Sequence, residues 1–228
     1  MPKFKAVLFD CDGVLVDSEP ITNEVLRVML GERGWELSLA ECMRIFTGKA
    51  VKDETALIEQ QTGQPLTPEW FVQFRERRNE ALLQSLQAIP NIHLAMQMLG
   101  PRYGTQIACA SGADLFKVKL QLDKVGLRPY FEDRIFSGHD LPRSNPYPDV
   151  YLAAAQHLGV DAAQCVVVED TVTGVRAGVA AGATVLGYSQ EGADSAHARS
   201  LREVGAVHCF ADMAELPAWV LHAPQQGA

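Results

Sequence analysis

The sequence of 228 residues has no long hydrophobic run. A membrane-spanning helix needs roughly 18 uninterrupted apolar residues, and no segment here provides them. The amino-terminal residues 1–13 reach acidic positions after a brief apolar segment and offer no small-residue cleavage site, so we expect no signal peptide. These absences predict a cytoplasmic protein without a membrane partner.

A basic stripe is also absent. The chain has 20 Lys and Arg against 28 Asp and Glu, a net charge of −8, and its basic residues are scattered. Proteins that bind a nucleic-acid backbone concentrate Lys and Arg on one surface, so we expect no nucleic-acid partner. A small anionic ligand would require local cations or a metal ion.

The five cysteines form no CxxC pair. An odd number of cysteines without metal-site spacing fits a reducing compartment with free thiols. Cys109, Cys165 and Cys209 lie in apolar runs, where free cysteine behaves as a small buried hydrophobic residue. We therefore predict core packing for these three.

Short apolar runs recur between helical patterns, at residues 6–9, 105–110, 134–136, 165–168, 184–188 and 206–210. Fully apolar runs separated by helices are typical of parallel strands that are covered on both faces. The pattern predicts an α/β fold with a Rossmann-like parallel sheet and helices on both of its faces.

The alternation is interrupted between the first two strands, where no convincing strand signal occurs. Ser38 with Glu41 has the pattern of a capping box, Gly63 ends a further helix, and Thr67 with Pro68 begins another. We predict an all-helical cap domain over residues 17–86.

The predicted core domain therefore has two parts, residues 1–16 and 87–228.

Two carboxylates follow the first strand of the core domain, at Asp10 and Asp12. In an extended chain, side chains two positions apart face the same way, so both can point beyond the strand's end. Parallel α/β sheets bind ligands at that edge, and Mg²⁺ suits carboxylates combined with phosphate oxygens. The pair therefore indicates a magnesium site that acts on a phosphate.

The acidic pair has two other interpretations. A plain turn is one, because Asp and Gly are common in turns. An EF-hand calcium loop is the other, and it does not fit, because Val14 stands where a third oxygen ligand is expected.

The longer string F-D-C-D-G-V-L-V-D-S at residues 9–18 resembles the haloacid dehalogenase-like superfamily, specifically its phosphatases and phosphoglucomutases with a helical cap. The resemblance implies that Asp10 is a nucleophile that forms an aspartyl-phosphate, that Asp12 is the general acid and base, and that Mg²⁺ is the cofactor. Asp12 also argues against the dehalogenase branch, which has no leaving-group oxygen to protonate.

Two further motifs match this superfamily. In "IACASG", Ser111 and the backbone N–H of Gly112 would hold phosphate oxygens, although Ser after a strand is also a common helix N-cap. In "CVVVEDTVTG", Asp170 would bind Mg²⁺ directly, with Glu169 helping directly or through water. The alternative for these two acids is a favourable charge at the positive end of a helix.

One position departs from the family pattern. Relatives usually have Lys at the start of a K-P-x-P-D segment. Residues 144–149 of this chain read "SNPYPD", so Asn145 stands at the position of that Lys. The missing charge is expected to cost on the order of 2 to 3 kcal/mol, roughly 30- to 150-fold in rate. Arg143 is the first candidate to replace it, and Lys117 and Lys119 are weaker ones; plain solvation is the alternative for all three.

The resemblance also indicates residues of the cap that face the active site in relatives. They are Glu19, Thr22, Gly48, Lys49 and Lys52, of which Lys49 and Lys52 could contact a second anionic or hydroxylated substrate group. Both lysines could equally be solvated surface. β-Phosphoglucomutases have His where Thr22 falls, which favours a phosphatase, and "FSGHDLPR" looks like bacterial phosphatases acting on sugar phosphates.

These observations together predict a monomeric, Mg²⁺-dependent phosphatase that hydrolyses a small phosphorylated metabolite, with a sugar phosphate as the expected substrate. Two alternatives stay open: phosphoryl transfer like that of β-phosphoglucomutase, and a low-activity protein that binds a phosphorylated ligand.

Overall fold

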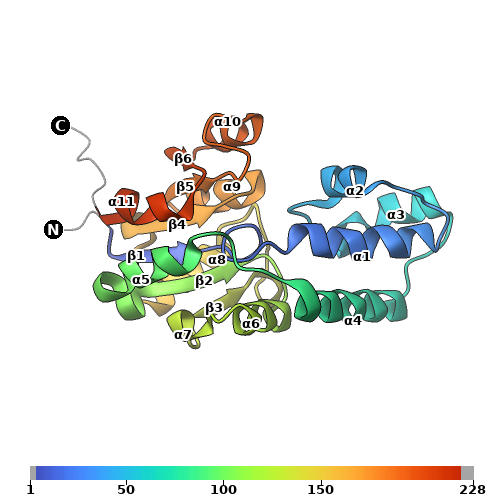
Figure 1. The fold of residues 1–228 in the computed structure, drawn as a ribbon, viewed down its shortest axis with the longest axis horizontal. Coiled ribbons are helices and arrows are strands. Elements are labelled where there is room, and N and C mark those ends of the chain that lie inside the picture. The colour runs from blue at the N-terminus through green and yellow to red at the C-terminus, as the bar shows by residue number, and fades with distance from the viewer. Residues whose placement is uncertain (1–3, 222–228) are drawn as a thin grey trace. The chain divides into compact units, whose positions relative to one another are not determined.

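A single six-stranded parallel sheet organises most of the chain (Figure 1). The structure is a computed structural model and describes residues 4–221. The strand order is β3-β2-β1-β4-β5-β6. The strands are β1 (Ala6–Phe9), β2 (Ile107–Ser111), β3 (Ile135–Ser137), β4 (Cys165–Glu169), β5 (Thr184–Tyr188) and β6 (His208–Phe210).

The predicted Rossmann-like α/β fold is confirmed. Every residue of β1, β2 and β4 is buried, and apart from the last residue of β2 and of β4 these strands are uninterrupted apolar runs in the sequence. The second strand starts later than predicted, because residues 104–106 form a 3₁₀ turn before it. All five cysteines are buried and free, including the three expected in the core.

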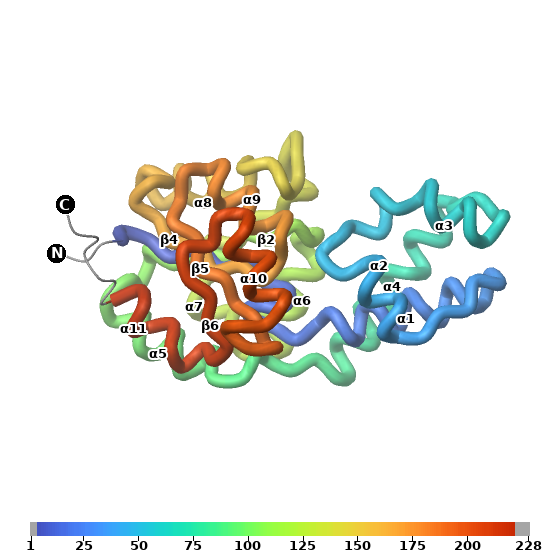
Figure 2. The backbone as a smooth tube through the Cα atoms, turned by 90° about the horizontal axis from the view of Figure 1, so that it is seen from above, coloured from blue at the N-terminus to red at the C-terminus, as the bar shows by residue number. Residues whose placement is uncertain are grey.

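Helices cover both faces of the sheet (Figure 2). One face packs against α8 (Asp149–His157), α9 (Val172–Ala180) and α10 (Ala196–Glu203). The other face has α5 (Ile92–Tyr103), α6 (Leu115–Lys124), α7 (Arg128–Phe131) and α11 (Leu216–Leu221). The short 3₁₀ turns of this unit are η2 (Gly104–Gln106), η3 (Gly138–Asp140), η4 (Ala162–Gln164) and η5 (Met213–Glu215).

A second compact unit comprises residues 17–87, and the sheet unit comprises residues 1–16 and 88–228. The second unit contains α1 (Glu19–Gly31), α2 (Leu39–Phe46), η1 (Val51–Glu54), α3 (Thr55–Thr62) and α4 (Pro68–Ser85), and no strand is assigned within it. It has its own apolar core, in which Leu26 and Met29 of α1 pack with Trp70 and Phe74 of α4.

The predicted helix ends in this unit are confirmed. Ser38 and Glu41 form a reciprocal capping box at the start of α2, and Thr67 accepts a hydrogen bond from the Trp70 N–H at the start of α4. Gly63 ends α3 with a φ of 65°. Across the described residues, no helix is both long enough and apolar enough to cross a membrane.

Candidate active site

The strand order brings separated motifs to one edge of the sheet. Because β1 lies between β2 and β4, the residues at their carboxyl ends are neighbours in space. Asp10 follows β1, Ser111 ends β2, and Glu169 ends β4 immediately before Asp170.

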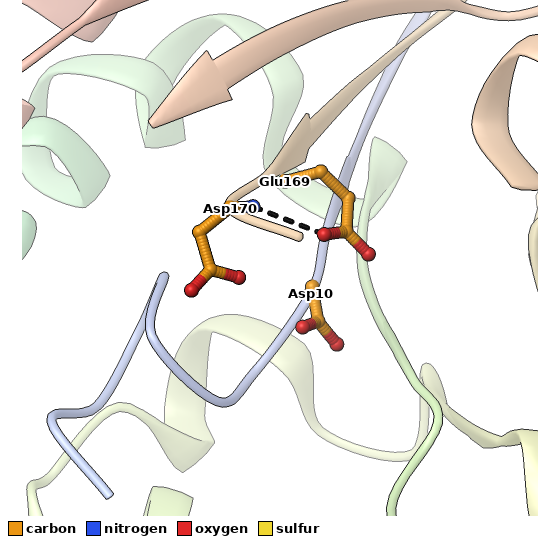
Figure 3. Close-up of side chains that lie close together, drawn as sticks. All are labelled: Asp10, Glu169 and Asp170. Atoms are coloured by element: carbon orange, nitrogen blue, oxygen red, sulfur yellow. Dashed lines mark hydrogen bonds between the residues drawn. The ribbon is translucent and has the colours of Figure 1, made fainter. Parts of the chain in front are cut away.

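Three carboxylates meet at this edge, those of Asp10, Glu169 and Asp170 (Figure 3). Each offers one oxygen, and these oxygens lie within 4.8 Å of one another. Asp10 and Glu169 are buried and Asp170 is half-buried. Such a cluster of oxygen donors in a partly enclosed place suits a hard cation such as Mg²⁺.

The charged form of the Asp10 carboxylate is disfavoured by its surroundings. Burial raises the pKa of Asp10 well above its usual value, and the negative charges of Glu169 and Asp12 raise it further. A hydrogen bond with Ser111 lowers it in part. The Oδ1 atom of Asp10 is buried and has no hydrogen-bond partner among the described residues. A cation beside Asp10 would relieve both the repulsion and the unpaired oxygen.

Glu169 is held by a dense set of donors. Its Oε2 accepts hydrogen bonds from the Asp170 N–H at 3.0 Å, the Thr171 N–H at 2.9 Å and the Thr171 hydroxyl at 3.0 Å. Its Oε1 accepts from the buried Tyr151 hydroxyl at 2.7 Å. Burial nevertheless raises the pKa of Glu169. Since Oε2 is fully engaged, only Oε1 retains capacity for a cation or a water.

The Asp170 carboxylate occupies the space that a side chain at Gly13, in the loop after β1, would need. A Cβ atom added to Gly13 would lie 1.9 Å from the Asp170 Oδ2, and Gly13 has a φ of +75°. Only glycine therefore allows the carboxylate of Asp170 to approach this loop so closely.

Asp12 lies outside the three-carboxylate cluster, which differs from the expectation that its side chain joins Asp10 at the metal. The Lys117 Nζ donates to its Oδ1 at 2.8 Å and to its Oδ2 at 2.9 Å, and the Gln121 Nε2 donates to Oδ1 at 2.8 Å. The physical reason is local. The chain bends at Cys11, so the alternation of side chains in a strand ends before Asp12.

Asn145 lies close to Gly112, the residue that follows Ser111. A Cβ atom added to Gly112 would lie 3.8 Å from the Asn145 Nδ2, so the loop with Asn145 packs beside the end of β2. Asn145 precedes Pro146 through a cis peptide bond, and its Oδ1 is buried without a hydrogen-bond partner among residues 4–221. Ser111 is not the helix N-cap, because Asp114 caps α6.

The family model for haloacid dehalogenase-like hydrolases matches residues 4–182 of this chain. The chain belongs to the haloacid dehalogenase-like hydrolases. A solved haloacid dehalogenase-family hydrolase from Deinococcus radiodurans R1, with bound phosphate and sodium, is 35% identical with a TM-score of 0.76, covering 96% of this chain and 95% of that one.

Two curated relatives from Escherichia coli K12 resemble this haloacid dehalogenase-like hydrolase. The 6-phosphogluconate phosphatase is 28% identical over 186 residues, which cover 81% of this chain and 82% of the relative. The fructose-1-phosphate phosphatase YqaB is 28% identical over 181 residues, which cover 79% of this chain and 94% of the relative.

The structure does not support Arg143 as the replacement for the missing family lysine. Its guanidinium forms an ion pair with Asp149 at 3.1 Å and lies 4.6 Å from the centre of the Tyr147 ring. The side chain is 56% exposed, so solvent already screens its charge. Among the described residues, Lys117 contacts one of the predicted acids of this hydrolase, Asp12, and its side chain is only 9% exposed.

The other candidates belong to the helical unit of this hydrolase. Gly48, Lys49 and Lys52 are exposed, and Lys49 forms an ion pair with Glu54 at 3.3 Å. Glu19 accepts a hydrogen bond from Asn23, and the Thr22 hydroxyl is buried with no hydrogen-bond partner in the described part of the chain.

Sequence reasoning missed several residues that shape the site of this hydrolase. Gln121, Tyr151, Thr171 and His197 were not singled out, yet each contacts one of the predicted acids or its main chain. The i, i+4 spacing of Lys117 and Gln121 on one helix was the available signal, because such residues share a face.

Proposed function

We propose that this protein is a Mg²⁺-dependent phosphatase that hydrolyses a small phosphorylated metabolite through an aspartyl-phosphate on Asp10. The observation that supports this most directly is the meeting of the Asp10, Glu169 and Asp170 carboxylates beside Ser111 at the carboxyl edge of the sheet. Acids from two strands and a hydroxyl from a third provide a nucleophile, a cation site and a phosphate contact together.

The residues present fit a magnesium ion. Carboxylate oxygens are the ligands that Mg²⁺ prefers, and the buried Oδ1 of Asp10 has no hydrogen-bond donor in the described part of the chain to offset its charge. Asp10 and Asp170 would hold the ion, and Glu169 would assist through its Oε1 or through a water. A bound Mg²⁺ would supply positive charge that lets a phosphate approach these acids.

Asp10 is the proposed nucleophile because it matches the nucleophile position in the motif of the haloacid dehalogenase-like family, and its carboxylate is buried directly after β1. Ser111 and the N–H of Gly112 would hold phosphate oxygens next to it. Asp12 would protonate the leaving-group oxygen and then accept a proton from the attacking water, so that one difficult transfer becomes two easier steps. For proton donation, its carboxylate must leave the ion pair with Lys117.

The proposed site has less positive charge than the family pattern provides. Asn145 stands at the position of the usual lysine, and its amide can hydrogen-bond a phosphate without neutralising it. Lys117 supplies one buried charge, but that charge is paired with Asp12 rather than with Asp10. We therefore propose that phosphate hydrolysis is slower than in a variant with Lys at position 145.

The substrate class follows from the relatives. The two curated relatives are named for 6-phosphogluconate and fructose 1-phosphate, both phosphorylated sugar derivatives, and the Deinococcus structure contains bound phosphate. We propose a sugar phosphate for this chain, with residues 17–86 as the cap domain and Lys49 and Lys52 as contacts for a second polar substrate group. A cytoplasmic monomer remains our prediction.

A second candidate function is a protein that binds a phosphorylated ligand with little turnover. The observation that favours it is Asn145, whose neutral side chain would weaken the stabilisation of a transferring phosphate but leaves the candidate metal site and Ser111 in place. Phosphoglucomutase-like transfer has no such specific support, and a requirement for a sugar bisphosphate would reveal it.

The experiment is a screen for phosphate release from a panel of sugar phosphates with Mg²⁺. Wild-type protein, Asn145→Lys and Asp10→Asn are compared under the same conditions. We expect activity in the wild type, none in Asp10→Asn, and a turnover roughly 30- to 150-fold higher in Asn145→Lys. Equal turnover of wild type and Asn145→Lys would show that another cation already acts there. Ligand-induced stabilisation without phosphate release would favour the binding protein.

A further inference from the structure

A histidine outside all the sequence motifs contacts the main chain of the candidate metal site. His197 lies in the first turn of α10, and its Nε2 is 2.7 Å from the main-chain oxygen of Asp170. Its Nδ1 is 3.2 Å from the hydroxyl of Ser189. The ring therefore spans the gap between the residue that follows β4 and the residue that follows β5.

The contacts assign one tautomer to the neutral ring. A carbonyl oxygen can only accept, so Nε2 must donate its hydrogen to Asp170, which leaves Nδ1 as an acceptor. Ser189 then donates its single hydroxyl hydrogen to Nδ1. Consequently, the hydroxyl of Ser195, at 3.0 Å, donates to Ser189, while accepting from the Ala198 N–H at 3.0 Å.

This chain of hydrogen bonds is anchored at both ends. Ser189 is fully buried, and Ser195 is the N-cap residue of α10. At the other end, the Asp170 side chain rests against Gly13, where there is no room for a Cβ atom. Asp170 is thus held through its main chain by His197 and positioned through its side chain by the loop after β1.

We propose that His197 is a positioning residue for the metal site, which acts by fixing the main chain of Asp170 so that its carboxylate faces Asp10. The inference rests on the proposed function, because it assumes that Asp170 binds the ion. Outer partners of metal ligands typically contribute 10- to 100-fold to metal affinity. We expect about tenfold here, the lower end of that range, because His197 contacts the main chain and not the ligating carboxylate.

The test uses two amides that differ by one methylene. In His197→Gln the Nε2 can take the place of the histidine Nε2 and still donate to the Asp170 carbonyl. In His197→Asn the amide is too short for that contact but stays polar and can still reach Ser189. His93→Asn, at an exposed position of α5, is the matched control for the loss of a histidine.

The Mg²⁺ dissociation constant of each full-length protein is measured by titration calorimetry, and its free energy of unfolding is measured with the metal chelated. We expect Mg²⁺ binding about tenfold weaker in His197→Asn than in wild type. The Mg²⁺ dissociation constants of His197→Gln and His93→Asn are expected to lie within about twofold of the wild-type value. The difference between the two amides separates positioning from general stability, because both remove the imidazole from the same place.

The outcomes distinguish this inference from the function on which it rests. If the wild type binds Mg²⁺ and His197→Asn binds it equally well, the positioning role is wrong and the proposed function stands. If His197→Gln loses as much Mg²⁺ affinity as His197→Asn, the hydrogen bond to the Asp170 carbonyl is not the cause of the loss, and the positioning role is refuted in this case too. If the wild type binds no Mg²⁺, the proposed metal site fails, and the inference fails with it.

Discussion

Lys117 offers the sharpest test of the electrostatics at the candidate site. Its ammonium lies 2.8 Å from Asp12 Oδ1, and the two side chains are only 9% and 14% exposed. At that separation and an effective dielectric near 20, the pair attracts by about 6 kcal/mol before the cost of removing both charges from water. Removing one partner of such a pair leaves a poorly solvated charge, which typically costs about 3 to 5 kcal/mol.

We predict that Lys117→Met lowers the free energy of unfolding by about 3 kcal/mol, the low end of that range, because both side chains retain some exposure. Asp12→Asn should cost less, about 2 kcal/mol, since Asn can still accept a hydrogen bond from the lysine. The double variant removes both charges at once. It should be about 2 kcal/mol more stable than the sum of the two single effects predicts.

The assay is urea denaturation with the metal chelated, followed by circular dichroism. Lys119→Met is the matched control, because Lys119 lies two residues away on the same helix, and its effect should stay near 0.5 kcal/mol. Single effects that simply add, with a coupling energy below about 0.5 kcal/mol, would refute the reasoning. In that case solvent screens the pair, and Lys117 provides no buried charge to the site.

Two further predictions concern the acids that surround the proposed metal. Gly13→Ala should weaken Mg²⁺ binding at least about tenfold in calorimetry, because the new methyl group displaces the Asp170 carboxylate. An unchanged Mg²⁺ dissociation constant would show that Asp170 is not a ligand. The raised pKa of Asp10 means that its ionisation opposes folding, so stability in chelator should fall as the pH rises above the ordinary value of 3.8. The free energy of unfolding of Asp10→Asn, measured in chelator, should therefore exceed that of wild type at pH 7, and this difference should become smaller toward pH 4. A difference in unfolding free energy that does not change with pH would contradict the raised pKa of Asp10.

The fold could be predicted well from the sequence because its signals are local. Strands that are buried on both faces are mostly apolar, so β1, and β2 and β4 up to their last residues, are visible as short hydrophobic runs. Helix ends are equally local, as Ser38 with Glu41 shows, since a cap involves residues a few positions apart. The parallel order of the sheet then brings Asp10, Glu169 and Asp170 to one edge without further information.

Which partner each acidic residue contacts could not be predicted, even for Lys117, a candidate cation in the sequence, because the partners come from other parts of the chain. Lys117 is 105 positions from Asp12, and Tyr151 is 18 positions from Glu169. His197 reaches Asp170 only because β4 and β5 are adjacent and α10 begins beyond β5. The loop after β1 also bends at once, which removes Asp12 from the spot where an extended chain would have placed it.

The amino-acid sequence by itself therefore determined which chemical groups are present and which edge of the sheet they occupy, because hydrophobic runs and motif spacing act within one segment. Only the tertiary structure decided which of these acids is paired with a cationic side chain and which acids lie together in the three-carboxylate cluster. That outcome depends on packing between segments: Asp12 forms an ion pair with a buried lysine, whereas Asp10 lies beside two other acids and its buried Oδ1 has no hydrogen-bond partner among residues 4–221.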